Sequence, residues 1–141
     1  MDREGREQVL GFHLPGEIIG LFLTERVPMG IPPAEAARAI RAQGGVVYVP
    51  HPFDPMRRNM AESALYQLAS EGLIDAVEVL NAKTSLSSLN RRAAEFAASF
   101  DLAAGAGSDA HVPDAIGAAY VEMPDFDGPA DFVARLRDAV V

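Results

Sequence analysis

The chain has 141 residues, of which 49% are hydrophobic, enough to bury the core of one domain. Its 20 acidic and 12 basic residues give a formal net charge of -8, which repels nucleic-acid phosphates. The absence of cysteine excludes disulfides, thiolate nucleophiles and sulfur-bound zinc. Apolar runs are far shorter than the roughly 18 residues of a membrane span, and no signal-peptide pattern opens the chain. We therefore expect a cytoplasmic protein without nucleic-acid or membrane partners.

Hydrophobic periodicity and turn residues predict alternating strands and helices. Residues 1–15 show no apolar period and are predicted to be an irregular lead-in to a domain over residues 16–141. Asn59 is predicted to cap the second helix together with Glu62. The predicted strands are short apolar or β-branched runs at residues 18–23, 46–49, 74–80, 103–107 and 118–123. The predicted helices have apolar residues at helical spacing and cover residues 33–43, 60–71, 86–100 and 129–140.

This alternation predicts the fold class. Strands that alternate strictly with helices are usually parallel and joined by right-handed crossovers, so the class is α/β. A complete eight-stranded barrel takes about 250 residues, and five strands cannot close one. The sequence therefore predicts either an open sheet or an arc of a barrel.

Two of the three histidines follow predicted strands. His51 lies between Pro50 and Pro52, and His111 belongs to an Asp-x-His motif with Asp109. Functional side chains of parallel sheets gather at the carboxyl ends of the strands. The prolines are expected to hold His51 in an extended conformation, and an extended Asp109–His111 segment would place both side chains on one face. Imidazole with carboxylate suits zinc, manganese or iron, so we predict a divalent metal site at these residues.

Other charged residues lie near these motifs. Arg57 follows His51, and Lys83 follows the third predicted strand, so either could contact the phosphate of a small phosphorylated substrate. Glu78 lies within that strand and either points into a polar centre or pairs with a basic group. Purely structural interpretations remain open: Arg57 on a solvated approach to a helix, His51 bonded to backbone, and Asp109 in a helix cap.

Three segments carry a family resemblance: Gly44–Asp54 (GGVVYVPHPFD), Val77–Thr84 (VEVLNAKT) and Ala106–His111 (AGSDAH). They resemble the PHP (polymerase and histidinol phosphatase) family of metal-dependent phosphoesterases, and the resemblance runs from about Gly16 to the end. In that family a distorted (β/α)7 barrel binds metals at the carboxyl ends of its strands, and a metal-bound hydroxide hydrolyses phosphate esters.

The resemblance also implies a ligand set. His51, Asp109 and His111 fall on metal-ligand positions, and Glu17 falls where many members have a ligating histidine. In the family, Glu17 and His51 would serve one metal, Asp109 a second and His111 a third. The family's opening His-x-His strand, its later Asp-His pair and its bridging Gly-x-Glu carboxylate have no counterpart here. The resemblance therefore implies a partial PHP-type barrel of about five mostly parallel strands and four helices, incomplete at the amino end.

These observations leave competing functional hypotheses. The first is a metal-dependent phosphoesterase in which Arg57 or Lys83 steadies the phosphate oxygens, with impaired activity in this chain alone. The second is a non-catalytic or split-barrel module, completed by a second copy, a partner or a missing amino-terminal half. A third, weaker hypothesis keeps the metal but cleaves amides.

Overall fold

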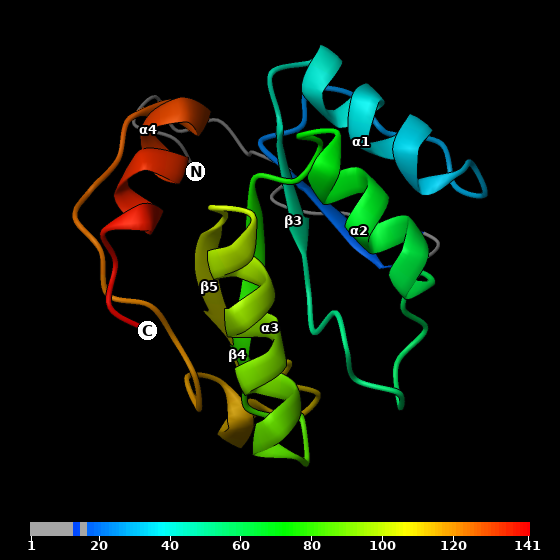
Figure 1. The fold of residues 1–141 in the computed structure, drawn as a ribbon. Coiled ribbons are helices and arrows are strands. Elements are labelled where there is room, and N and C mark those ends of the chain that lie inside the picture. Colours follow the sequence, from blue (N-terminus) through cyan, green and yellow to red (C-terminus); the bar gives the residue numbers. More distant parts are fainter. Residues whose placement is uncertain (1–12, 15–16) are drawn as a thin grey trace.

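The computed structural model describes residues 13, 14 and 17–141, which form one mixed β-sheet with helices packed against it (Figure 1). The strands are β1 (His13–Leu14), β2 (Ile18–Leu21), β3 (Val46–Val49), β4 (Ala76–Asn81) and β5 (Ala103–Gly107). The helices are α1 (Pro33–Ala42), α2 (Glu62–Ser70), α3 (Ser87–Ser99), α4 (Gly128–Arg137) and the 3-10 helix η1 (Pro113–Ala115). The α/β class expected from the sequence is confirmed.

The strands lie in the order β1-β2-β3-β4-β5, and only β3, β4 and β5 run parallel to one another. β2 pairs antiparallel with β3, which corrects the expectation of parallel strands throughout. The reason lies in the connection: Leu21 at the end of β2 pairs with Val46 at the start of β3. The irregular residues 22–32 therefore carry the chain back along the sheet before α1 returns it. As a result, the amino end of β2 lies at the same edge as the carboxyl ends of β3 to β5.

Two further expectations need correction. Residues 118–123 form no strand, because their only backbone pairing among the described residues is one antiparallel bridge between Glu122 and Val140. In the segment expected to be an irregular lead-in, the two residues of β1 pair with β2, a tertiary contact that no local periodicity reveals. Residues 1–12 lie outside the described residues. The described strands form an open sheet with β1 and β5 at its edges, so the barrel stays a prediction.

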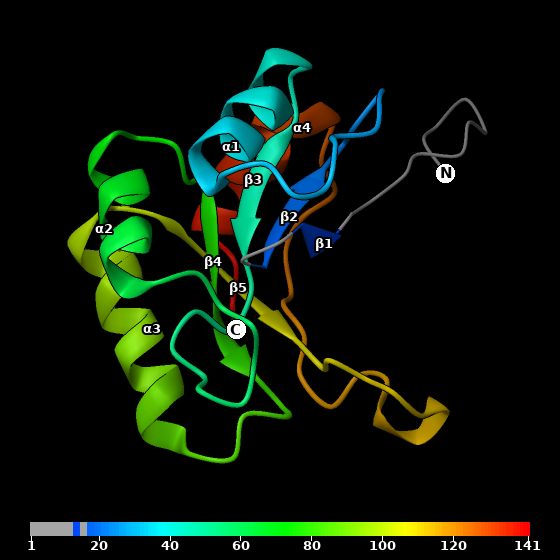
Figure 2. The ribbon, with the colours of Figure 1, turned by 90° about the vertical axis from the view of Figure 1, so that its right-hand side faces the viewer.

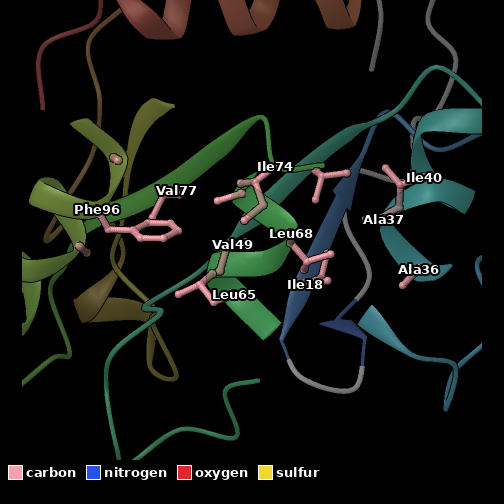
Figure 3. Packing of buried hydrophobic residues seen from close by; sticks show 14 of the residues in the cluster. Ile18, Ala36, Ala37, Ile40, Val49, Leu65, Leu68, Ile74, Val77 and Phe96 are labelled. Carbon is pink, nitrogen blue, oxygen red and sulfur yellow. The ribbon is translucent and has the colours of Figure 1, made fainter. Parts of the chain in front are cut away.

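The side chains of the central strands alternate between two apolar layers. Val47, Val49 and Val77 pack with α1, α2 and α3, which share one core cluster (Figure 3). Figure 2 shows α2 and α3 together on one side of the sheet. Tyr48 and Ala76 face the other way, into a smaller cluster with residues of α4. Two covered faces explain why these strands read as continuous apolar runs. None of the described helices is long and apolar enough to cross a membrane.

Candidate metal centre

The predicted site residues gather at the edge where β3, β4 and β5 end. His51 lies two residues beyond β3, and Asp109 lies two residues beyond β5. Asn81 is the last residue of β4 between them, and Glu17 directly precedes the antiparallel β2. Because β2 runs against its neighbour, its first residues reach the carboxyl ends of the parallel strands. The fold thus brings four separate stretches of sequence to one edge.

The ring of His51 is buried and held in one orientation. The amide nitrogen of Asn59 donates to the carbonyls of His51 and Asp54, at 2.9 and 2.8 Å, so its oxygen must face the imidazole. That oxygen lies 3.2 Å from Nδ1, which therefore carries the ring proton in the neutral tautomer. The expected cap by Asn59 is wrong: α2 begins at Glu62, its N-cap position is Ala61, and no side chain caps it. The lone pair of Nε2 is consequently available to a ligand.

Glu17 presents a carboxylate oxygen to that lone pair. Its Oε2 lies 2.8 Å from Nε2 of His51. The same oxygen is buried and has no hydrogen-bond partner among the described residues. Two electron-rich atoms at this separation repel one another unless a proton or a metal ion lies between them. Carboxylate with neutral imidazole is a donor set that divalent transition metals accept, so these two residues fit a metal.

Three of the four predicted ligands have a left-handed backbone. The φ angles are +47° at Glu17, +26° at His51 and +50° at Asp109. Positive φ at residues other than glycine costs on the order of 1–3 kcal/mol and is concentrated at functional sites. The extended conformations expected at His51 and Asp109 are therefore wrong. At His51 the carbonyl also accepts a hydrogen bond from the backbone N–H of Asp54, and this turn outweighs the preference that Pro52 imposes.

Asp109 and His111 form a second pair, with two basic side chains beside it. The guanidinium of Arg57 forms an ion pair with Oδ2 of Asp109. Nδ1 of His111 lies 2.8 Å from both Nζ of Lys83 and the carbonyl oxygen of Asp109, and 3.8 Å from Oδ1 of that aspartate. His111 is largely exposed, whereas His51 is buried. Arg57 thus lies at the site as the ion-pair partner of Asp109, and Lys83 lies beside His111.

Glu78 and Asn81 connect the two pairs. Oε2 of Glu78 accepts hydrogen bonds from the backbone N–H of His51 and from the amide of Asn81, both at 2.9 Å. The same amide nitrogen lies 3.3 Å from Oδ2 of Asp109. Burial raises the pKa of Glu78 above its ordinary value, and the hydrogen bonds from Asn81 and His51 offset part of that effect. The only sequence signal for this role is a carboxylate within an otherwise apolar strand.

A second buried carboxylate, Asp54, fixes the loop after His51. Its Oδ1 accepts from the backbone N–H of Met56 at 2.9 Å, and its Oδ2 accepts from the hydroxyl of Thr84 at 3.1 Å. Sequence reasoning gave Asp54 no role, because its partner comes from the loop after β4, 30 residues away. The loop that carries His51 is therefore tied to the neighbouring strand end.

The predicted ligands form two pairs and not one cluster. Glu17 and His51 make the first pair, and Asp109 and His111 make the second. The allocation implied by the resemblance also puts Glu17 and His51 together, but it assigns Asp109 and His111 to different metals. Within the described residues, no group of three or more histidine, aspartate or glutamate side chains is arranged to hold one metal ion. A cation bound at either pair would need further ligands, such as water or substrate oxygens.

The chain is similar to two uncharacterized proteins of Methanocaldococcus jannaschii. The first is 37% identical over 131 residues, which cover 86% of this chain and 55% of that protein. The second is 40% identical over 81 residues, which cover 55% of this chain and 44% of that protein. The chain thus spans about half the length of the curated relatives it matches.

Solved structures resemble the chain at lower identity. PsfC from Pseudomonas syringae PB-5123 is 20% identical, with a TM-score of 0.62 over 90% of this chain and 55% of that chain, which shows a shared fold. A two-domain protein from Bacteroides vulgatus, described as containing a predicted PHP-like metal-dependent phosphoesterase, is 21% identical. Its TM-score is 0.49, over 65% of this chain and 27% of that chain.

The family model described as PHP-associated matches residues 87–141. This stretch contains α3, β5 and α4, together with the motif of Asp109 and His111. With the segments around His51 and Glu78, this match supports a carboxyl-terminal portion of a PHP domain over these residues.

Proposed function

We propose that this chain contributes to a metal-dependent phosphoesterase, with Glu17 and His51 holding a divalent cation. The observation that carries the proposal is the contact between Nε2 of His51 and the buried, unbonded Oε2 of Glu17. The mixed nitrogen and oxygen donors suit zinc, manganese or iron. Two protein ligands leave coordination positions for water and for substrate oxygens. When bound, such a cation supplies positive charge that polarises a phosphate ester and makes water more acidic.

The chain's own cations would hold the phosphate. Arg57 and Lys83 lie beside Asp109 and His111, so an anionic group arriving there meets two positive charges in an otherwise acidic protein. A cavity of about 300 Å³ lies beside this group of side chains. It is lined by Lys83, Asp109 and His111 and by small apolar residues such as Ala115. This space would accept a small phosphorylated substrate, whose phosphate replaces part of the ion pairing now made within the protein.

Metal binding and hydrolysis can be tested together. Manganese should bind the wild-type chain in a calorimetric titration, and His51→Ala should weaken that binding and any hydrolysis of phenyl phosphate at least about tenfold. Glu71→Gln is a matched control, since Glu71 follows the last turn of α2 and forms a surface ion pair with Arg38. Equal manganese affinity and equal rates for the wild type and His51→Ala would reject the proposal. An amide panel assayed in parallel separates phosphoesterase activity from amide hydrolysis.

A second candidate function is supported by the open sheet. Among the described strands, β5 pairs only with β4, so no described strand occupies its other edge, where a strand of another chain could add. Near the carboxyl end, Leu80, Tyr120 and Val140 line a cavity of about 310 Å³, and all three side chains are exposed. We infer that this edge and patch would pair with a second copy, giving a split-barrel module without catalysis.

Light scattering after size exclusion tests this second candidate. A mass that rises from monomer to dimer with concentration supports it. A monomer at every concentration that also binds manganese would contradict it.

A further inference from the structure

We propose that Glu78 is the positioning residue that couples the two halves of the candidate metal centre, the Glu17–His51 pair and the Asp109–His111 pair. This inference rests on the proposed function, because it assigns a role within the same site. Glu78 is 6% exposed on β4, the strand between the one that leads to His51 and the one that leads to Asp109. It accepts hydrogen bonds from the backbone N–H of His51 and from the side chain of Asn81, which in turn contacts Asp109. Its carboxylate therefore bridges residues that are far apart in sequence.

The first coupling is to the backbone of His51. The N–H of His51 donates to Oε2 of Glu78 at 2.9 Å. His51 has a φ of +26°, a conformation that its own side chain disfavours and that neighbouring contacts must hold. Asn59 holds the ring and the carbonyl of the same residue, while Glu78 holds its amide. Loss of the bond from Glu78 would release the backbone that aims Nε2 at Glu17.

The second coupling passes through Asn81 to Asp109. The oxygen of the Asn81 side chain accepts from the backbone N–H groups of Lys83 and Thr84, at 2.9 and 3.1 Å. Its nitrogen must therefore point the other way, where it lies 2.9 Å from Oε2 of Glu78 and 3.3 Å from Oδ2 of Asp109. Asn81 is 2% exposed, so water cannot readily replace these partners. Glu78 thus fixes the amide that holds the carboxylate of Asp109.

The end of β5 leaves space for this carboxylate. A Cβ atom added to Gly107 would overlap Oε1 of Glu78. Gly107 is not among the residues with positive φ, so space and not backbone freedom is what its missing side chain provides. Two residues later the chain reaches Asp109. A side chain at position 107 would therefore displace Glu78 without altering its chemistry, which offers an independent way to test the coupling.

If Glu78 had a purely structural role, an apolar residue would be more favourable at this position. A buried carboxylate is costly unless its charge is paired, and Glu78 takes hydrogen bonds from two uncharged N–H groups. An apolar side chain would fill the same place within the sheet at lower cost in desolvation. The chain instead keeps an acceptor that both halves of the site share, which is the expected pattern for residues that orient metal ligands.

Three variants separate the possibilities. Glu78→Gln keeps an acceptor oxygen for both N–H groups, Glu78→Met removes it, and Gly107→Ala pushes the native carboxylate aside. With manganese alone as the probe, calorimetry should give Glu78→Gln an affinity close to that of the wild type. Glu78→Met and Gly107→Ala should bind manganese about tenfold to a hundredfold more weakly. Glu71→Gln again serves as the surface control.

A second measurement does not depend on metal. Hydrogen exchange of the His51 amide, followed by NMR in the presence of a chelator, should be slow in the wild type and Glu78→Gln. It should be markedly faster in Glu78→Met and Gly107→Ala, while amides of α1 stay unchanged. If wild type and Glu78→Met protect the His51 amide equally, the positioning role is wrong. If the wild type fails to bind manganese but exchange follows this pattern, the proposed function fails and the coupling through Glu78 stands.

Discussion

At His51, one side-chain amide decides which ring nitrogen is available. Asn59 uses its nitrogen for two backbone carbonyls and its oxygen for Nδ1, which leaves Nε2 pointing at Glu17. The position of His51 after a β-branched strand was predictable from the sequence. The role of Asn59 was not, because the same residue also fits the pattern of a helix cap. Local sequence gives candidate partners for a polar side chain, and the tertiary structure selects among them.

Asn59→Ala should weaken manganese binding about tenfold, because the ring of His51 would lose the bond that fixes its tautomer and orientation. The helix content measured by circular dichroism should stay the same, since Asn59 makes no capping bond to α2. Gln67→Ala, at an exposed site on α2, is the matched control. Unchanged manganese affinity together with a loss of helix would show that Asn59 acts as a cap after all.

At the scale of elements, strand positions were easier to predict than strand directions. β3 and β5 occupy the predicted residues 46–49 and 103–107, because runs of β-branched or small residues end there, before Pro50 and at Gly107. The direction of β2 depends on the path of residues 22–32, which shows no periodicity from which a direction could be inferred. That direction matters for the site, since it brings Glu17 to the edge where His51 lies.

The packing of α1 on the sheet gives a stability prediction. Ile40 is fully buried against β2 and β3, and Figure 3 shows it beside Ala37 within the core. Ile40→Ala should lower the free energy of unfolding by about 2–5 kcal/mol, from lost burial and the cavity left behind. Ile116→Ala, at a residue that is 74% exposed, should change it by less than about 0.5 kcal/mol. Urea denaturation of both variants measures the difference, and equal losses would contradict the described core.

For the whole molecule, the α/β class could be predicted from the alternating strand and helix patterns of the sequence. Whether the sheet closes into a barrel could not. The described strands leave β1 and β5 at open edges, and the chain spans about half the length of the relatives it matches. Closure depends on which strands are available to pair, a property of the assembled domain and not of any single segment. The convergence of His51 and Asp109 at one edge was predictable, since parallel strands share that edge. The pairing of Asp109 with His111 was not, because the resemblance assigns these two residues to different metals.

Anomalous X-ray scattering from crystals grown with manganese tests the central claim most directly. The account predicts an anomalous peak at coordinating distance from both Oε2 of Glu17 and Nε2 of His51, and loss of that peak in His51→Ala. A wild-type crystal with the two side chains in direct contact and no peak between them, or with manganese bound only elsewhere, would contradict it.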